Sequence, residues 1–568
     1  MSMHYKPVST MVRGWSLAAA MGLAAVFAGA QQPTPTPPQT KAPNSAPGQT
    51  SSQAPGLPAG KSASKPGTET RITPEQAKQL FSLVDELIQF SSQETGLPVK
   101  STVKRQLTTR TAVESYLKEK FEEDESAKRL QRGEIVLKKF GMLDRDFDLK
   151  PFLLALLKEQ IEAYYDSKTK TVNLLDWIDI DEQKPVLAHE LTHALQDQHI
   201  DLEKWSDQTP SEVSVDYRGD IDHLAKDEID TAREAVAEGQ ATAVMMDNIL
   251  KPMGKSLLKD PEVVDFIKQK MTGSDSSPVM ARAPLLLSES LLFPYREGLS
   301  FEQDVWMDQG QTAAFAGALD RPPSSTWEII NPREFEKAKV PIVPLLPDIH
   351  PVVDKVYKPY DIGQVGELDV HILTELLGGE NAARDLTPSW DGGIYWAGQR
   401  LSAKTPAELA STKSISLFYL SAWKNDSSAQ AFAKLYANAL GRKYSGLHRD
   451  ENALRSTPAD APAGTIEQVY STNEGPVVIT MRGRLVFVAE SFDLPMARKL
   501  TSMILDAQGT GELKMADATR PAPLAAQPAG NAQSAGPTLS AGLVHFFADC
   551  GVMKAAVQAG LKAAAYAK

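Results

Sequence analysis

The segment 185–199, PVLAHELTHALQDQH, constrains the fold of this chain more than any other segment. Its proline suits the first turn of a helix. The residues around its first two histidines carry no charge: Val186, Leu187, Ala188, Leu191, Thr192, Ala194 and Leu195. A helix face in contact with solvent would carry charged residues at these positions. The segment therefore predicts a buried helix that begins at about Pro185.

The same segment contains the pattern HExxH, formed by His189, Glu190 and His193. Residues four apart lie on one face of a helix, so both imidazoles can reach one metal ion. Glu190 can then reach a water molecule bound to that metal, which is the geometry of a zinc-activated water with a carboxylate base. We predict Zn2+ as the cofactor, His189 and His193 as ligands and Glu190 as the general base. The alternative is a helix whose two histidines are only packed.

Three residues compete for the third ligand position. Glu238 is favoured, because EAVAEGQATAVMMD predicts a helix whose small residues, Gly239 among them, let two helices approach closely. Glu234 lies one turn earlier on the same face, and Glu238 would then support a ligand histidine instead. His199 follows the second motif histidine by six residues, the spacing of metzincins, but it reaches the metal only if the helix ends near Gln196. All three residues remain open.

The rest of the chain predicts an α+β fold. Thr73 followed by Pro74 marks a helix start. Segments 163–165 and 171–175 are strand-like and flank a polar turn, which predicts a hairpin. Helical patterns continue to about 335, and an α+β texture with an antiparallel sheet follows from about 350. The expected helices before 335 lie at 107–130, 150–160 and 224–250. The expected strands lie at 394–397, 414–422, 466–471, 476–481 and 484–490, with helices at 428–440 and 494–507.

The two ends of the chain differ from the centre in composition. Lys6 and Arg13 precede an uncharged apolar run that ends in Ala28-Gly29-Ala30, so we expect residues 1–30 to be a cleaved signal peptide. Residues 31–70 hold nine prolines and no aromatic residue, which predicts a disordered tether. A similar linker is expected at 516–543, followed by an Ala-rich helix at 544–568. We expect export to the periplasm or the medium and no stable membrane span after signal cleavage.

Charge and cysteine content exclude several classes of protein. The chain has 60 Lys and Arg against 72 Asp and Glu, a net charge of −12, whereas a general nucleic-acid binder needs a basic face. We therefore expect no nucleic-acid partner. A single cysteine, Cys550, excludes an intrachain disulfide and a Cys-rich zinc site. The ligands must then be histidines and carboxylates, as in catalytic zinc sites.

HELTHALQDQH followed by a helix carrying EGQA resembles the gluzincin-type zinc metallopeptidases, and among them uncharacterised exported bacterial and archaeal proteins of this pattern. Segments 291–306 and 321–335 look like further parts of the same family. The resemblance covers about 150–340. It implies a zincin-like catalytic domain, mainly helical in its pattern, which we place at 71–345. The change of pattern after it predicts a smaller antiparallel α+β domain at 350–515. The resemblance also implies that a downstream glutamate is the third ligand.

One further residue follows from the resemblance. Gluzincin aminopeptidases carry a tyrosine in a Y-x-x-G helix some sixty residues after the ligand glutamate, and it stabilises the oxyanion. Tyr295 and Gly298 match this pattern, 57 residues after Glu238. The alternative is a tyrosine packed at a helix start. The chain lacks the G-x-M-E-N exopeptidase motif, so an aminopeptidase assignment is not supported.

The sequence thus predicts an exported zinc-dependent endopeptidase that acts on a peptide or protein substrate. Two rival functions stay open. One is a non-catalytic envelope-binding protein with a structural zinc site, and the other is a zinc hydrolase of a non-peptide amide. Glu190 argues against the first rival, because a structural site needs no base beside its first histidine.

Overall fold

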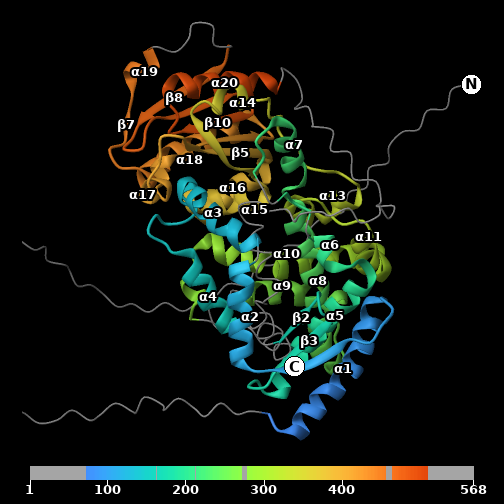
Figure 1. The fold of residues 1–568 in the computed structure, drawn as a ribbon. Helices are drawn as coiled ribbons and strands as arrows, with labels where there is room; N and C mark the ends of the chain where they lie inside the picture. The colour runs from blue at the N-terminus through green and yellow to red at the C-terminus, as the bar shows by residue number, and fades with distance from the viewer. Residues whose placement is uncertain are drawn as a thin grey trace, which may run out of the picture. The chain divides into compact units, whose positions relative to one another are not determined.

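The computed structural model describes residues 72–508 except 124, 161–162, 207, 211–212, 272–277 and 456–462. The predicted signal peptide, both tethers and the C-terminal helix lie outside the described residues. All described residues belong to one unit, Thr68–Lys568. Within it the fold is α+β, as predicted (Figure 1).

The first part of this unit is mainly helical. Its α-helices are α1 (Pro74–Thr95), α2 (Arg110–Glu123), α3 (Glu125–Phe140), α4 (Leu149–Gln160), α5 (Ile180–Ile200), α6 (Leu202–Ser206), α7 (Tyr217–Lys226), α8 (Ile229–Leu250), α9 (Pro261–Lys270), α10 (Leu285–Gln309), α11 (Ala318–Asp320), α12 (Thr326–Ile330) and α13 (Pro332–Glu336). Short helical turns lie at η1 (Lys251–Met253), η2 (Leu257–Lys259), η3 (Met280–Arg282) and the π-helical η4 (Ala313–Gly317). The helix predicted at 107–130 is wrong at its start, because β1 occupies Lys104–Thr108.

Helix α1 begins as its sequence predicts. The Thr73 side chain accepts a hydrogen bond from the Gln76 N–H and the Gln76 side chain accepts one from the Thr73 N–H, which closes a capping box. Leu80, Val84 and Leu87 form its buried face. The Ser91 hydroxyl on the same helix donates to the Ala188 carbonyl at 3.1 Å. Helix α1 is therefore packed directly against α5, the helix that carries HExxH.

A small sheet lies beside α5 in the order β1-β3-β2. The predicted hairpin is confirmed: β2 (Ala163–Asp166) pairs antiparallel with β3 (Thr171–Leu175). Strand β1 pairs with β3 in parallel, which the sequence did not indicate. Strand β2 is consequently an edge of this sheet.

The C-terminal part is built on a seven-stranded antiparallel sheet in the order β4-β5-β6-β10-β9-β8-β7. Its strands are β4 (Tyr357–Gln364), β5 (Trp390–Arg400), β6 (Ile415–Trp423), β7 (His448–Arg449), β8 (Thr465–Ser471), β9 (Val477–Arg482) and β10 (Leu485–Glu490). Its helices are α14 (His350–Val353), α15 (Glu367–Gly378), α16 (Glu380–Leu386), α17 (Pro406–Leu409), α18 (Asp426–Lys443), α19 (Glu451–Arg455) and α20 (Leu494–Ala507), with turns η5 (Thr387–Ser389) and η6 (Thr412–Ser414). The five predicted strands are confirmed, whereas β4 and β7 were not predicted.

Helices cover both faces of this sheet. Neighbouring residues of a strand point to opposite faces. Tyr419 accordingly shares a core with Phe432 of α18, while Phe418 shares a second core with Leu500 of α20. The first core continues without interruption into the helical part, through α3 and Phe140. The division into a peptidase domain and an accessory domain stays a prediction.

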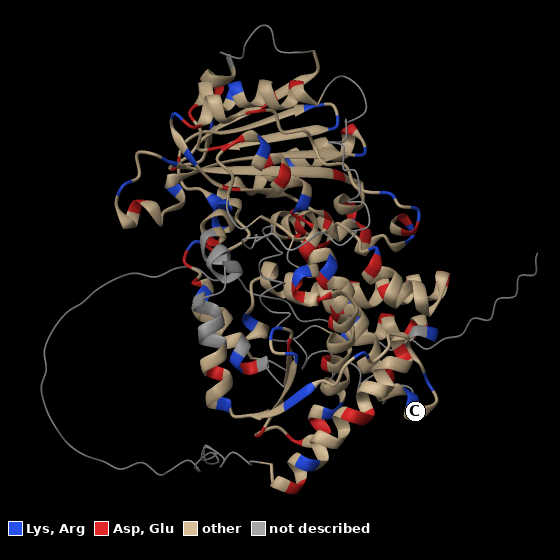
Figure 2. Ribbon diagram, turned by 45° about the vertical axis from the view of Figure 1, so that its right-hand side comes forward, with Lys and Arg blue, Asp and Glu red and all other residues tan. Residues whose placement is uncertain are grey.

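The distribution of charge and the apolar character of the helices complete the description of the fold. Basic and acidic residues are interspersed along the described part of the ribbon in Figure 2. Of the helices that the structure describes, none combines the length and the apolar character needed to cross a bilayer.

Candidate metal centre

Helix α5 runs from a partly exposed first turn into the core, where the residues of the HExxH motif lie. It begins at Ile180, not at Pro185 as predicted, because the Asp179 side chain caps it by accepting from the Asp181 N–H. Pro185 therefore lies inside the helix. The Gln183 amide fixes the first turns to β3, donating to the Leu175 carbonyl and accepting from the Leu175 N–H, both at 2.9 Å. The stretch from Val186 to Leu195 is buried, as predicted, and the burial extends to Asp197, which was expected to be a solvated helix end.

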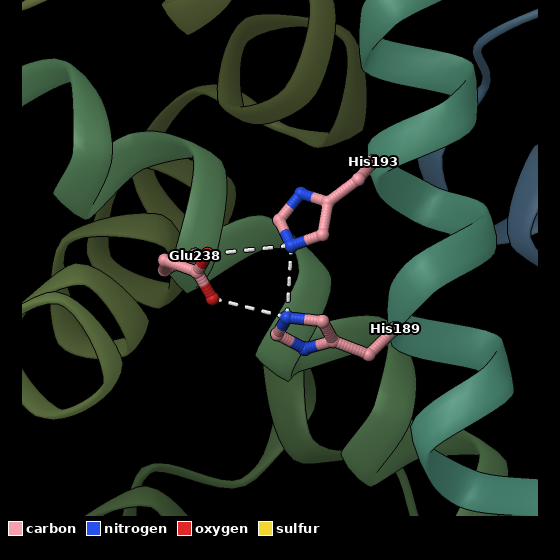
Figure 3. A group of neighbouring side chains, drawn as sticks. All are labelled: His189, His193 and Glu238. Carbon is pink, nitrogen blue, oxygen red and sulfur yellow. Dashed lines mark hydrogen bonds and ion pairs between the residues drawn. The ribbon is translucent and has the colours of Figure 1, made fainter. Parts of the chain in front are cut away.

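His189, His193 and Glu238 converge in the core between α5 and α8 (Figure 3). The Nε2 atom of His189 lies 3.0 Å from Glu238 Oε2, and Nε2 of His193 lies 3.3 Å from Oε1. The two Nε2 atoms lie 2.9 Å apart. All three side chains are buried. This buried group could hold a metal ion.

The protonation of this group is governed by burial and by its single carboxylate. Burial lowers the pKa of His189 to about 4, although Glu238 acts in the opposite direction. Burial also acts against charge on His193, but the Glu238 carboxylate outweighs it and raises the pKa to about 10. Burial would raise the pKa of Glu238, yet the two histidines lower it to about 2. The two histidines thus favour the carboxylate form of Glu238, which is the form that can bind a cation.

Glu190 is held against the edge strand of the small sheet. Its Oε2 atom accepts a hydrogen bond of 2.7 Å from the Tyr165 N–H of β2. The Tyr165 hydroxyl donates to Asp197 Oδ2 at 2.7 Å, and the Lys170 ammonium contacts the same carboxylate at 2.7 Å. Burial and the Asp197 carboxylate raise the pKa of Tyr165. The base predicted beside the metal therefore lies at the junction of α5 and β2.

A close helix crossing places Glu238 in this group. Gly239 packs against α10, because a Cβ atom at this position would lie 2.3 Å from the Gly298 carbonyl oxygen. A Cβ on Gly298 would in turn lie 2.1 Å from the Ala235 carbonyl oxygen. The predicted role of Gly239 in close approach is confirmed, and its partner is the glycine of the Y-x-x-G pattern.

Tyr295 lies one turn before this crossing, in the middle of α10 and not at a helix start. Its ring is buried and stacks against His189, with centroids 6.3 Å apart and planes inclined by 21°. The structure thus places Tyr295 next to His189.

The two alternative third ligands lie outside the group. Glu234 is buried on α8 one turn before Glu238, but it is not among the residues whose ligand atoms converge. Helix α5 does not end near Gln196 but continues to Ile200. His199 consequently points elsewhere, and its Nε2 contacts Asp320 Oδ1 at 2.9 Å.

Sequence reasoning missed Gln196 and Gln240 as residues of the site. Gln196 Oε1 lies 2.8 Å from Nδ1 of His193, and the Gln196 amide donates to Gln240 Oε1 at 2.9 Å. The available signal was position: Gln196 follows His193 by three residues, so it shares a helix face with the motif.

The centre therefore contains two imidazoles and one carboxylate that converge in the core, with a second carboxylate on the next residue of the motif helix. A tetrahedral metal held by these three residues would keep one coordination position open. Comparisons with protein-family models, with curated proteins and with solved structures found no match for this chain.

Proposed function

We propose that this chain is a zinc-dependent peptidase, an endopeptidase that cleaves peptide or protein substrates after export. The observation that carries the proposal is the position of Glu190: a carboxylate follows the first histidine of a buried His-His-Glu group and also contacts an edge strand. His and carboxylate donors suit zinc, and their number fits a catalytic site better than a structural one.

His189, His193 and Glu238 would hold the ion. Zinc bound there would lower the pKa of a water molecule and polarise the scissile carbonyl. Glu190 accepts the proton of the attacking water and returns it to the leaving amine. The Tyr295 hydroxyl donates a hydrogen bond to the oxyanion as charge develops.

Strand β2 is proposed to orient the substrate. An edge strand has unpaired backbone groups, to which an extended peptide can add as a further strand. Because the Tyr165 N–H already contacts Glu190, a peptide aligned along β2 would have its backbone next to the base. This arrangement favours an extended peptide over a small amide.

The test compares Glu190→Gln with Glu182→Gln, an exposed position in the first turn of the same helix. We expect about one zinc per chain in the wild type and in both variants. Cleavage of denatured casein should fall by about 10²–10⁴-fold only in Glu190→Gln, because only that change removes the base. Full cleavage by Glu190→Gln would contradict the assigned base. A wild type that folds without zinc and cleaves nothing would contradict the proposal as a whole.

A further inference from the structure

Two buried amides link the metal centre to the π-helical segment η4. They are Gln196 on α5 and Gln240 on α8, and neither side chain is accessible to solvent. Buried amides are costly unless each donor and acceptor finds a partner, so their orientation is informative.

The orientation of Gln240 is fixed by backbone carbonyls. Its Nε2 atom lies 3.0 Å from the Ala314 carbonyl oxygen and 3.0 Å from the Phe315 carbonyl oxygen, both within η4. A carbonyl can only accept, so the NH2 group of Gln240 must face η4. Its Oε1 atom must then face the opposite way, towards Gln196.

The orientation of Gln196 follows in the same manner. Its Nε2 atom lies 2.9 Å from Gln240 Oε1 and 3.0 Å from the Ala237 carbonyl oxygen, which are both acceptors. The remaining oxygen of Gln196 therefore faces Nδ1 of His193, at 2.8 Å. Because this oxygen can only accept, the hydrogen of the imidazole must lie on Nδ1.

We propose that Gln196 is a positioning residue of the metal centre: by accepting from Nδ1 of His193 it leaves Nε2 as the lone pair directed at the metal. This inference rests on the metal-binding part of the proposed function. Gln196 also fixes the Ala237 carbonyl, one residue before Glu238, so a single side chain sets the positions of a ligand on α5 and a ligand on α8. Supporting contacts of this kind typically change metal affinity by about 10–100-fold.

The test measures zinc affinity by competition with a chromogenic chelator in Gln196→Met and Gln196→Glu. The control is Gln198→Met, whose amide accepts from the Lys100 and Ser101 N–H groups, away from the metal centre. We expect Gln196→Met to weaken zinc binding by about 10–100-fold. Gln196→Glu keeps the acceptor for Nδ1 and should retain most of the affinity, although it loses the bonds to Gln240 and Ala237. Gln198→Met should bind zinc as the wild type does.

The outcomes separate this inference from the proposed function. Equal zinc affinity in Gln196→Met and the wild type would overturn the positioning role while leaving a zinc peptidase intact. Equal losses of zinc affinity in Gln196→Met and Gln196→Glu would overturn it too. The amide would then support the fold around the centre without acting through Nδ1 of His193. If the wild type binds no zinc, the proposed function fails as well. Should Gln196→Met not fold, Gln240→Met takes its place beside Gln196→Glu: both keep an oxygen facing Nδ1 of His193, so both should retain most of the zinc affinity, and a loss of about 10–100-fold in both would overturn the positioning role.

Discussion

The metal centre and an ionic cluster beneath the seven-stranded sheet both bury carboxylates, but they balance the charge in different ways. In the sheet cluster, Lys139 Nζ contacts Glu474 at 2.8 Å and Lys443 Nζ contacts Glu490 at 2.6 Å. The Tyr436 hydroxyl also donates to Glu490 at 2.6 Å. Each carboxylate of this cluster therefore has its own cation within the chain.

In the metal centre, by contrast, the described residues pair Glu238 with the two histidines and with no lysine or arginine. The two Nε2 atoms lie only 2.9 Å apart, so in the absence of a metal at least one of them must carry a hydrogen directed at Glu238 or at the other ring. Burial would raise the pKa of Glu490, but Lys443 and Lys139 keep it low. The pKa of Glu238 is kept low by histidines that would lose their extra proton to a metal. The sheet cluster is thus balanced by lysines of the chain itself, whereas the proposed metal centre would take its cation from solution.

The largest expected effect comes from breaking the sheet cluster. Glu490→Gln leaves the fully buried Lys443 without its counter-charge, so we expect a loss of about 3–5 kcal/mol in the free energy of unfolding. Urea denaturation of the full chain measures it. The control is Glu451→Gln, since the exposed pair Arg449–Glu451 should contribute less than about 1 kcal/mol. Similar losses in both variants would show that the buried pair stabilises the fold no more than an exposed pair does.

A third type of buried carboxyl is kept uncharged by protonation, and it makes the free energy of unfolding depend on pH. Burial raises the pKa of Glu367 to about 7, although Asn331 donates to it at 2.8 Å. The folded state then keeps a proton that the unfolded state releases above pH 4.5. The protonated carboxyl therefore contributes fully to the free energy of unfolding below about pH 4.5. As the pH rises to 7, this contribution of about 3 kcal/mol is lost. Its carboxylate neighbours are Glu228 and Glu297, and Lys424 acts in the opposite direction.

Glu367→Gln checks this expectation. Unfolding free energies measured between pH 4.5 and 7.5 should show a weaker decline with pH in the variant than in the wild type. Asp361 and Asp220, whose pKa values burial raises to about 6, contribute in the same direction and remain in both proteins. An unchanged pH profile would show that Glu367 is ionised in the folded chain.

Zinc binding should raise the free energy of unfolding through the metal centre alone, independently of the sheet cluster. At a free zinc concentration 100-fold above its dissociation constant, binding should stabilise the wild type by about 2.7 kcal/mol. Glu490→Gln should show the same increment, because the sheet cluster does not hold the metal. His193→Ala should show none. Calorimetric unfolding with and without zinc measures all three, and a reduced increment in Glu490→Gln would mean that the two regions are coupled.

The sequence predicted what periodicity and motif spacing encode. Helix α20 spans Leu494–Ala507 as expected, and the i, i+4 histidines share one helix face. Glu238 was favoured because Gly239 follows it, and the glycine indeed marks a close crossing. The parallel pairing of β1 with β3 was missed, because partners distant in sequence leave no local pattern.

Buried polar residues were also beyond sequence reasoning. Lys139 lies in the last turn of α3, where a lysine is typical of an exposed helix end, yet its side chain is fully buried against Glu474. The same holds for Gln196, because its partner Gln240 lies on another helix and cannot be identified from the sequence around Gln196. Both residues acquire their roles from tertiary contacts, which composition and spacing do not encode.

The smallest expected effect sharpens the choice of third ligand. The His199 side chain is 20% exposed, and its partner Asp320 is 65% exposed. His199→Ala should therefore cost less than about 1 kcal/mol of stability. Zinc content should stay at one ion per chain, because α5 continues past Gln196 and directs His199 away from the centre. Glu238→Ala is the matched comparison, and it should lose zinc. If His199→Ala lost the metal and Glu238→Ala kept it, helix α5 would have to end earlier in solution than at Ile200, and the ligand set would be the metzincin-like one.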